Sequence, residues 1–286
     1  MNSLADLKRR IASVKQTGRI TGAMETISIA KMHKSLELYE SNNAYFDMID
    51  RFVKAVVADS SEDVQEILSP PQSGYDLVVA VSSDTGFCGA FNHDVFRLTD
   101  SMITDNTLLM TVGHTAADYY SSEKKIVADR VDTRFTHCAY TPDYKNARRM
   151  ADEILLRYGS DVKSVAVVYN GMISHASWGV RKLEILPLSV DTDGVSGGME
   201  FEPSAKEVFK LLLPQYISGI IYGVLVHSSA AEHSARRMAM SAATKNADAM
   251  ISALSIEYNR ARQSAVTAQI TEIIGSTQAI GANNER

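Results

Sequence analysis

The last third of the chain most constrains its fold, because residues 208–280 have the composition of one uninterrupted helix. Twelve alanines lie between Ala230 and Ala268, and no proline follows Pro214. Alanine has the highest helix propensity, and small or apolar residues recur here at steps of three and four. At about 1.5 Å per residue such a helix is on the order of 100 Å long, more than a globular core can bury. The segment therefore predicts one member of an extended helix pair.

Residues 3–57 predict the other member. Ser3 can cap the first turn, and an apolar seam at three- and four-residue spacing begins at Leu4. Gly18 and Gly22 each weaken a helix by about 1 kcal/mol relative to alanine, or else permit close contact between helices. Two seamed helices at opposite ends of one chain predict an antiparallel coiled coil with the intervening residues inserted at one end.

The inserted residues alternate short apolar runs with helical segments, after a polar boundary that contains Pro70, Pro71 and Gly74. Short apolar runs are typical of strands buried on both faces. The predicted strands are 76–82, 107–113, 165–170 and 180–190, and the predicted helices are 91–102, 115–121 and 146–158. Pro187 cannot donate to a ladder, so the fourth strand is predicted at an edge.

This alternation predicts an α/β domain with a Rossmann-like, mainly parallel sheet. Residues 191–198, rich in Gly, Ser and Asp, predict a mobile loop. The whole chain is then an N-terminal coiled-coil helix (1–57), an inserted α/β domain (58–205) and a C-terminal coiled-coil helix (206–286).

Residues 82–89, Ser-Ser-Asp-Thr-Gly-Phe-Cys-Gly, carry the strongest hints of chemistry in the insert. Asp84 opens the Asp-Thr-Gly triplet of aspartic proteases, but such enzymes need two of these carboxylates in an all-β fold. Gly86 and Gly89 could form a phosphate-binding turn, yet the chain lacks the spaced glycines and the lysine that cradle phosphate. Cys88 as a nucleophile would need a base such as His93. A structural turn with a packed thiol is favoured, and no catalytic, cofactor or metal site is predicted.

Charge is distributed unevenly along the chain. The net charge of −5 divides into +3 for residues 1–57, −10 for 58–202 and +2 for 203–286. The basic N-terminal helix is either a solvated face or a surface for an acidic partner, and without interleaved aromatic residues a protein is favoured over nucleic acid. The two cysteines, Cys88 and Cys138, are interpreted as buried free thiols in a reducing compartment, although a bridge between them stays open. No secretory signal or membrane span is predicted.

Several motifs resemble the γ subunit of F-type ATP synthases over nearly the whole chain. The C-terminal helix carries Ser229-Ala-Ala-Glu-His-Ser-Ala-Arg-Arg-Met-Ala-Met240, followed by Ala243-Thr-Lys-Asn-Ala247 and Tyr258-Asn-Arg-Ala-Arg-Gln263. The N-terminal run Leu7–Thr17 and the turn at residues 81–89 are similar to the same family. One departure is Thr85, which stands where the family usually has arginine.

The resemblance implies a non-catalytic central rotor stalk, which couples ion-driven rotation to ATP synthesis or hydrolysis. Implied partners are the α and β subunits of the catalytic head, the ε subunit (δ in mitochondria) and the ring of c subunits. The expected location is peripheral, on the cytoplasmic face of the bacterial inner membrane, with the mitochondrial matrix face as the alternative; the start at Met1 favours the former. The coupling ion, H⁺ or Na⁺, stays open, and the alternative function is a coiled-coil adaptor with a non-catalytic α/β domain.

The resemblance also implies which side chains meet partners. Those expected at the α/β ring are Arg9, Arg10, Lys15, Met24, Lys31, Arg262, Gln263, Thr271 and Glu272. Those expected in a turn at the foot of the rotor are Asp84, Gly86, Cys88 and Gly89.

Overall fold

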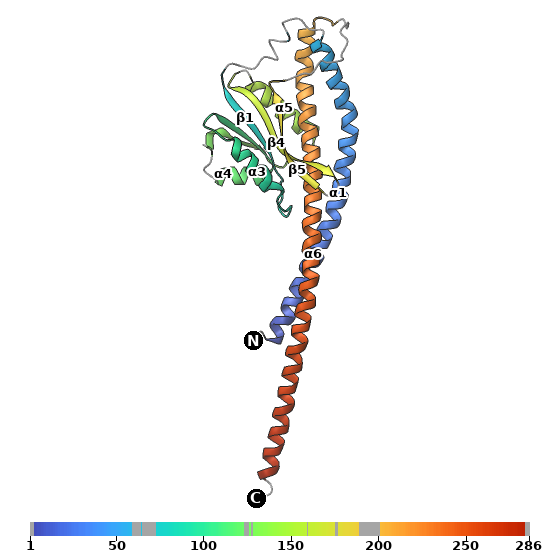
Figure 1. The fold of residues 1–286 in the computed structure, drawn as a ribbon, viewed down its shortest axis with the longest axis vertical. Helices are drawn as coiled ribbons and strands as arrows, with labels where there is room; N and C mark the ends of the chain where they lie inside the picture. The colour runs from blue at the N-terminus through green and yellow to red at the C-terminus, as the bar shows by residue number, and fades with distance from the viewer. Residues whose placement is uncertain are drawn as a thin grey trace. The chain divides into compact units, whose positions relative to one another are not determined.

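The computed structural model combines two long helices with a five-stranded sheet (Figure 1). It describes residues 3–58, 64, 73–122, 126, 128–158, 160–174, 177–188 and 201–283, with side chains up to residue 274. Two compact units divide the chain: residues 1–26 with 240–286 form one, and residues 27–239 form the other. Each unit is described below by itself.

The long helices are α1 (Leu4–Ala58) and α6 (Ala205–Asn283), close to the predicted 3–57 and 208–280. Helix α6 begins earlier than predicted and runs through Pro214. Its start is set by Ser204, whose hydroxyl accepts a hydrogen bond from the backbone N–H of Glu207 at 3.3 Å. This cap satisfies one of the orphan N–H groups at a helix start, so the helix begins well before the proline.

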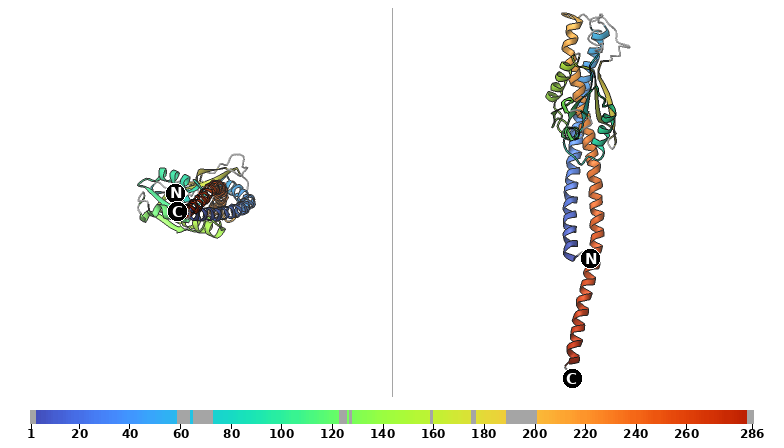
Figure 2. Two further views of the ribbon diagram at one scale, coloured as in Figure 1. Left: turned by 90° about the horizontal axis from the view of Figure 1, so that it is seen from below. Right: turned by 90° about the vertical axis from the view of Figure 1, so that its left-hand side faces the viewer.

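Contacts between α1 and α6 run in opposite directions along the two helices. In the unit formed by residues 1–26 and 240–286, the Thr21 and Thr244 hydroxyls are 2.7 Å apart, and Gly18 faces Ala247. In the unit of residues 27–239, the hydroxyls of Ser35 and Ser229 are 3.2 Å apart. Within the first unit, three residues forward along α1 are matched by three residues backward along α6, and Figure 2 shows the two helices side by side. The predicted antiparallel helix pair is confirmed.

The sheet contains β1 (Tyr75–Val81), β2 (Thr107–Val112), β3 (Val131–Phe135), β4 (Val162–Ser174) and β5 (Ser177–Leu186). Its strand order is β3-β2-β1-β4-β5. The pairings β1–β2, β1–β4 and β2–β3 are parallel, whereas β4 and β5 form an antiparallel hairpin at one edge. The mainly parallel sheet and the edge position of the strand before Pro187 agree with the sequence prediction, but β3 was not predicted.

Helices cover both faces of the sheet. Val78 and Ala80 of β1 face α3 (Phe91–Met102) and α4 (His114–Ser122), whose Val95, Phe96 and Ala116 complete one apolar layer. The intervening β1 residues, 77, 79 and 81, face α5 (Tyr144–Arg157) together with parts of α1 and α6. This alternation places a buried layer on each side, as expected of a parallel sheet.

The predicted helix boundaries within the inserted domain differ from the observed ones by at most two residues, whereas both ends of α6 differ by three. Helix α5 begins at Tyr144 rather than 146, because Asp143 caps it by accepting from the backbone N–H of Lys145 at 3.3 Å. A short 3-10 helix, η1 (Ala128–Arg130), precedes β3. The predicted loop at 191–198, Pro70 and Pro71 at the boundary, and residues 189–190 of the fourth predicted strand lie outside the described residues. The described strand ends at Leu186, directly before Pro187, so its predicted extension through the proline is wrong.

One stretch of α6 is long and apolar enough, by length and composition alone, to cross a membrane. The core helix of a globular domain passes the same test, and 44% of this window is buried within the structure. Ile217, Ile221 and Leu225 of α6 belong to the apolar layer beneath the sheet. Packing against the α/β domain therefore accounts for the apolar character of these residues.

Candidate functional site: the junction between the 82–90 turn and helix α6

Residues 82–90 connect the carboxyl end of β1 to the start of α3. Asn92 holds this turn: its Oδ1 accepts from the Ser83 N–H at 2.9 Å and its Nδ2 donates to Ser83 Oγ at 2.7 Å. Phe87 adopts the left-handed backbone region, with φ of 62°, and its side chain is 72% exposed. The turn therefore has a fixed base and a projecting apolar tip.

Asp84 ties the turn to two neighbouring loops. Its Oδ1 accepts from the backbone N–H groups of His114 at 3.0 Å and His137 at 2.8 Å, and its Oδ2 accepts from that of Tyr140 at 2.9 Å. Three backbone donors occupy both carboxylate oxygens, so the charge is stabilised by the peptide frame. Asp84 is a structural anchor, in agreement with the reading of this stretch as a structural turn.

Cys88 is a packed thiol. It is 2% exposed and lies in an apolar cluster with Phe91, Ala231 and Ala235. Burial raises the pKa of its thiol, an effect that a hydrogen bond with the Ser83 hydroxyl partly offsets. Burial likewise raises the pKa of Cys138, and both cysteines are free rather than bridged. Neither thiol has the lowered pKa of a nucleophilic cysteine.

Arg236 of α6 clamps the turn. Its Nη2 donates to the Thr85 carbonyl at 2.9 Å and to Thr85 Oγ1 at 2.8 Å, and its Nε donates to the Gly86 carbonyl at 3.2 Å. The same Nη2 lies 2.7 Å from Glu232 Oε1, in a pair whose side chains are 6% and 1% exposed. A planar guanidinium suits this role because it presents several donors in a fixed fork.

The surroundings of the clamp shift the pKa of two α6 side chains. Burial raises the pKa of Glu232 to about 7, although the charge of Arg236 opposes the shift. Burial, Arg236 and Lys31 lower the pKa of His233 to about 3, so its imidazole is neutral. The ring of His233 meets that of Tyr140 edge to face at 5.6 Å, and Lys31 Nζ lies 3.4 Å from the Tyr140 ring centroid. Lys31 thereby brings α1 into the junction.

Helix α6 covers the edge of the sheet at which α/β folds usually bind ligands. That edge is formed by the carboxyl ends of the parallel strands, beside the turn that follows β1. Here the small side chains of Ala231 and Ala235 pack against Cys88 and Phe91, with Trp178 of β5 alongside. Among the residues that the structure describes, no group of His, Cys, Asp and Glu side chains is arranged to hold a metal ion. The arrangement suits mechanical attachment of α6 to the domain.

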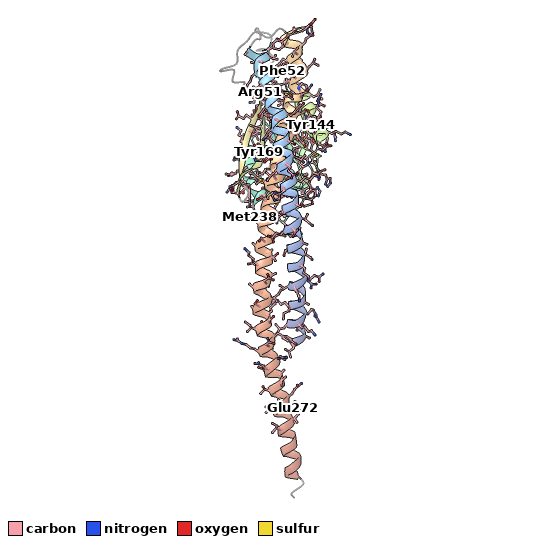
Figure 3. The ribbon with its side chains drawn as sticks, turned by 90° about the vertical axis from the view of Figure 1, so that its right-hand side faces the viewer. Arg51, Phe52, Tyr144, Tyr169, Met238 and Glu272 are labelled. Atoms are coloured by element: carbon pink, nitrogen blue, oxygen red, sulfur yellow. The ribbon has the colours of Figure 1, made fainter. Side chains whose placement is uncertain are left out.

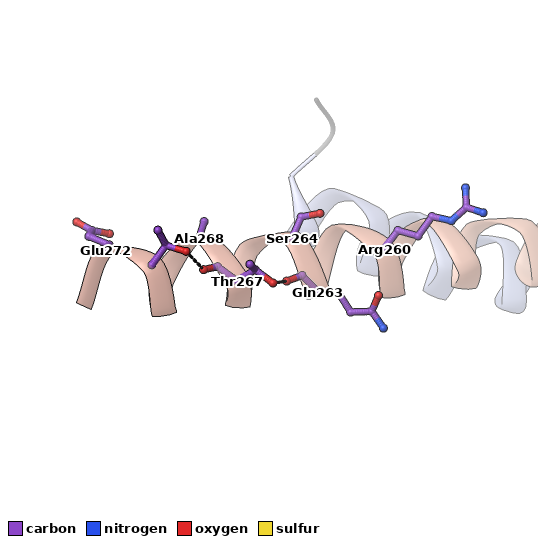
Figure 4. Close-up of a pocket in the computed structure, with 7 residues that line it drawn as sticks. Arg260, Gln263, Ser264, Thr267, Ala268 and Glu272 are labelled. Carbon is purple, nitrogen blue, oxygen red and sulfur yellow. Dashed lines mark hydrogen bonds between the residues drawn. The ribbon is translucent and has the colours of Figure 1, made fainter. Parts of the chain in front are cut away.

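The other predicted partner-contacting residues belong to the unit of residues 1–26 and 240–286. Arg9, Arg10 and Lys15 of α1 are exposed, and Met24 is half-buried. Arg262, Gln263, Thr271 and Glu272 are exposed on α6. In Figure 4 the last three line a shallow strip along one helix, where Thr271 Oγ1 donates to the Thr267 carbonyl and Thr267 Oγ1 to that of Gln263.

The structure thus places the predicted turn residues Asp84, Gly86, Cys88 and Gly89 with Lys31 in the unit of residues 27–239, and the remaining predicted residues in the other unit. Sequence reasoning missed that Glu232, His233 and Arg236 complete the site. The available signal was a buried-face pattern: ionisable residues at i, i+1 and i+4 within an alanine-rich helix.

Comparison with known proteins identifies the family. The profile of a family described as ATP synthase matches residues 3–280. A protein of Ruminiclostridium cellulolyticum named ATP synthase gamma chain is 33% identical, over 98% of this chain and 99% of its own length. The chain belongs to the ATP synthase γ-chain family. A second relative, from Acetobacterium woodii, is named ATP synthase gamma chain, sodium ion specific, and is 29% identical over 97% of this chain and 99% of its own.

Solved structures share the fold of this γ-family chain. The match to a chain of the Euglena gracilis mitochondrial ATP synthase has a TM-score of 0.71 at 17% identity, covering 99% of this chain and 96% of that one. A chain from the Tetrahymena thermophila mitochondrial ATP synthase, in a structure of its central stalk and c-ring, matches with a TM-score of 0.59 at 20% identity, covering 78% and 99%. The junction residues of this γ-family chain, Glu232, His233 and Arg236, lie in the sequence run that first suggested the resemblance.

Proposed function

We propose that this chain is the central-stalk rotor subunit of an F-type ATP synthase, coupling ion-driven rotation to ATP synthesis or hydrolysis in a catalytic head. It has no active site of its own in this proposal. Its contribution is a stiff, asymmetric shaft whose orientation changes the nucleotide affinities of the surrounding catalytic sites in turn. Such coupling is a free energy shared between sites through one element that takes several positions.

The observation that carries the proposal is the buried clamp of Arg236. A shaft that transmits torque needs the α/β domain and its helix to move as one body. Arg236 meets this need with three hydrogen bonds to residues 85–86 and a buried ion pair to Glu232. Hydrogen bonds to a buried charge are worth more than exposed ones, so the link resists shear.

The proposed partners follow the family and the printed titles of the matched structures, which include F1, OSCP and a c-ring. We assign the helix pair of residues 1–26 and 240–286 to the α and β subunits of the head. The α/β domain is assigned to the ε subunit (δ in mitochondria) and the ring of c subunits. The complex is then peripheral on the cytoplasmic face of a bacterial inner membrane, or on the matrix face in mitochondria.

Two exposed sets of side chains are proposed to meet the head. Arg9, Arg10 and Lys15 present positive charge on α1, which suits acidic loops, and Met24 and Lys31 lie further along the same helix. On α6 the exposed set is Arg262, Gln263, Thr271 and Glu272. Exposed ion pairs contribute only about 0–1 kcal/mol each, so these residues would act as a set of weak contacts.

The test uses the complex reconstituted with its α, β and ε subunits and membrane sector. Combined substitution of Arg262, Gln263 and Glu272 by alanine is expected to preserve ATP hydrolysis and to lower ion pumping per ATP hydrolysed. Paired ATPase and ion-pumping assays measure the ratio. The control replaces Arg148 and Asp152, an exposed ion pair on α5, by alanine.

Equal pumping per ATP in the triple variant and the control would show that these side chains do not transmit torque. The proposal as a whole has a separate test. A rotor subunit co-purifies at one copy per three α and three β subunits, whereas a coiled-coil adaptor has no reason to keep that ratio. Failure to assemble with the α and β subunits would overturn the proposed function.

A further inference from the structure

A cleft of about 310 Å³ lies in the unit of residues 27–239, between α1, α6 and the β4–β5 hairpin. Its walls come from four elements. Tyr39, Asn42 and Phe46 line it from α1, and Tyr216, Gly219, Gly223 and His227 from α6; Tyr169 and Ile185 line it from the sheet. Tyr169 is labelled in Figure 3. A volume near 300 Å³ is at the lower end of the range for small-molecule sites.

Aromatic rings form the sides of the cleft. Tyr39 stacks on His227 with ring centroids 4.6 Å apart, and Phe46 stacks on Tyr216 at 5.7 Å. Tyr169 lies 6.4 Å from the His227 ring. Flat rings that already stack in pairs offer faces on which a further planar ring gains contact at little cost in side-chain entropy.

The charges beside the cleft are paired: the Tyr216 hydroxyl donates to Asp50 Oδ1 at 3.1 Å, and Asp50 in turn lies 2.8 Å from Lys54 Nζ. Burial lowers the pKa of His227, as does the nearby charge of Arg181, and both effects disfavour its charged form. Among the described lining residues Glu184 alone is acidic or basic, and its side chain is 71% exposed and paired with Lys182 at 2.7 Å. A charged ligand would lose its hydration here without gaining a buried counter-charge.

Two asparagine amides line the cleft, and of these Asn43 is exposed to solvent. The amide of Asn42 is half-buried, and its Nδ2 lies 4.0 Å from where a Cβ on Gly223 would stand. An asparagine amide both donates and accepts hydrogen bonds. It therefore suits a ligand whose edge carries a carbonyl or an amide.

Two glycines one helical turn apart keep the cleft open. A Cβ on Gly219 would be in ordinary contact with the Phe46 ring, at 3.4 Å, and one on Gly223 would meet only Asn42. Glycine inside a helix costs about 1 kcal/mol relative to alanine, and no positive backbone angle requires it at either position.

We propose that this cleft is a binding site for a small, neutral, planar aromatic molecule that bears a carbonyl or amide edge. The rings of Tyr39, Phe46, Tyr169 and Tyr216 hold its faces, and Asn42 bonds to its polar edge. The site is separate from the junction at Arg236 and does not depend on the proposed rotor function.

The test titrates the full-length chain with 6-propionyl-2-dimethylaminonaphthalene, a neutral aromatic ketone whose fluorescence shifts to the blue in apolar surroundings. Saturable binding is expected with a Kd of roughly 100 µM, ordinary for a ligand of this size. The substitution Gly223→Leu fills the cleft and is expected to weaken binding about tenfold or more. Asn42→Ala removes the amide and is expected to weaken it about three- to tenfold.

The matched control is Gly22→Leu, the same substitution on α1 at a glycine with nothing within 4 Å of its Cβ position, and it is expected to change binding less than about twofold. The anion 8-anilinonaphthalene-1-sulfonate is expected to compete at least about tenfold less well. Leucine favours helix over glycine, so Gly223→Leu is expected to keep its melting temperature. If that variant fails to fold, Gly223→Ala takes its place with an expected loss of about threefold.

Equal binding by wild type and the Gly223 variant would overturn the proposal. So would equally tight binding of the anion, or the lack of saturation below about 1 mM.

Discussion

At the scale of single residues, the Glu232–Arg236 pair combines a large desolvation cost with a specific task. Burying two charges is often no better than burying apolar groups of the same shape, but removing one partner leaves the other uncompensated. Here Arg236 also donates to Thr85 and Gly86. It therefore holds a turn whose two adjacent residues lie 151 and 150 positions away along the chain. Thr85 suits the arrangement because its neutral hydroxyl accepts from Arg236, whereas an arginine there would bring a second positive charge.

Replacing Arg236 by alanine is expected to destabilise the chain by about 3 kcal/mol, because it leaves Glu232 buried without its cation and frees the turn. Urea unfolding of the full-length protein, followed by circular dichroism, measures the change. Arg148→Ala serves as the control, because its ion pair with Asp152 is 44% and 55% exposed and should contribute at most about 1 kcal/mol. A loss in Arg236→Ala no larger than the control's would show that the clamp contributes little.

Glu232→Gln is expected to change how stability depends on pH. In the folded chain the pKa of Glu232 is raised from 4.5 to about 7, so the native state binds a proton that the unfolded state releases. The contribution of Glu232 is therefore fully present below pH 4.5 and is lost as pH rises to about 7. Glutamine cannot ionise, so the variant should gain stability relative to wild type across this window.

The measurement is the difference in unfolding free energy between Glu232→Gln and wild type at several pH values. His233 titrates in the opposite sense, since its pKa is lowered from 6.5 to about 3 and its contribution grows as pH rises between those values. Taking the difference between two proteins that both carry His233 removes its effect to first order. A difference that stays constant from pH 4 to 8 would refute the raised pKa of Glu232.

At the scale of elements, Gly18 and Gly22 of α1 have different surroundings, although the sequence alone gives no reason to separate them. A Cβ on Gly18 would lie 3.3 Å from the Cβ of Ala247, whereas one on Gly22 would meet nothing within 4 Å. Gly18 therefore lies in the seam between α1 and α6, and Gly22 lies outside it. Close approach of the helices there is also marked by the 2.7 Å contact between Thr21 and Thr244.

Gly18→Leu is expected to push α1 and α6 apart and to destabilise their pairing by about 1–3 kcal/mol, the usual cost of overpacking. Hydrogen exchange of amides in residues 10–26 and 240–255 reports the effect locally. Gly22→Leu is the control, and it should slow exchange slightly because leucine favours helix. Slower or unchanged exchange in Gly18→Leu would contradict the assigned register.

The sequence predicts elements far better than it predicts the junction. Helices α1 and α6 follow from local propensity and seam spacing, and the apolar runs of β1 and β2 report burial on both faces. The sequence does not predict strand β3, because the charged residues Asp132 and Arg134 interrupt its apolar pattern. Its conformation depends instead on parallel pairing with β2. The clamp escapes it as well, because Arg236 and its acceptors are brought together only by the completed fold.

At the scale of the whole molecule, helix α6 extends past the start of α1. In the unit formed by residues 1–26 and 240–286, α1 begins at Leu4, and the register of Thr21 with Thr244 brings that start to about residue 261 of α6. Side chains from 266 to 274 are all exposed, and Ile270, Ile273 and Ile274 are among them. Figure 1 shows α6 continuing past the N-terminus of the chain.

Amides of residues 262–274 are expected to exchange rapidly in the isolated chain, because a lone helix in water is marginal without tertiary packing. Amides of 217–236, buried beneath the α/β domain, should exchange slowest. Hydrogen exchange followed by mass spectrometry compares the two segments, and assembly with α and β subunits should protect the first. Uniformly slow exchange along α6 would contradict this gradient.

The antiparallel register also limits how this chain can change length over evolution. A single deletion in the paired part of α1 would turn every later side chain by about 100° and shift it out of step with α6. Insertions and deletions within the pair should therefore survive only when both helices change together by whole repeats. The end of α6 beyond residue 261 extends past the start of α1 and escapes this restriction. Relatives aligned by structure should accordingly keep the spacing between Gly18 and Thr21 equal to that between Thr244 and Ala247, and differ in length beyond residue 261.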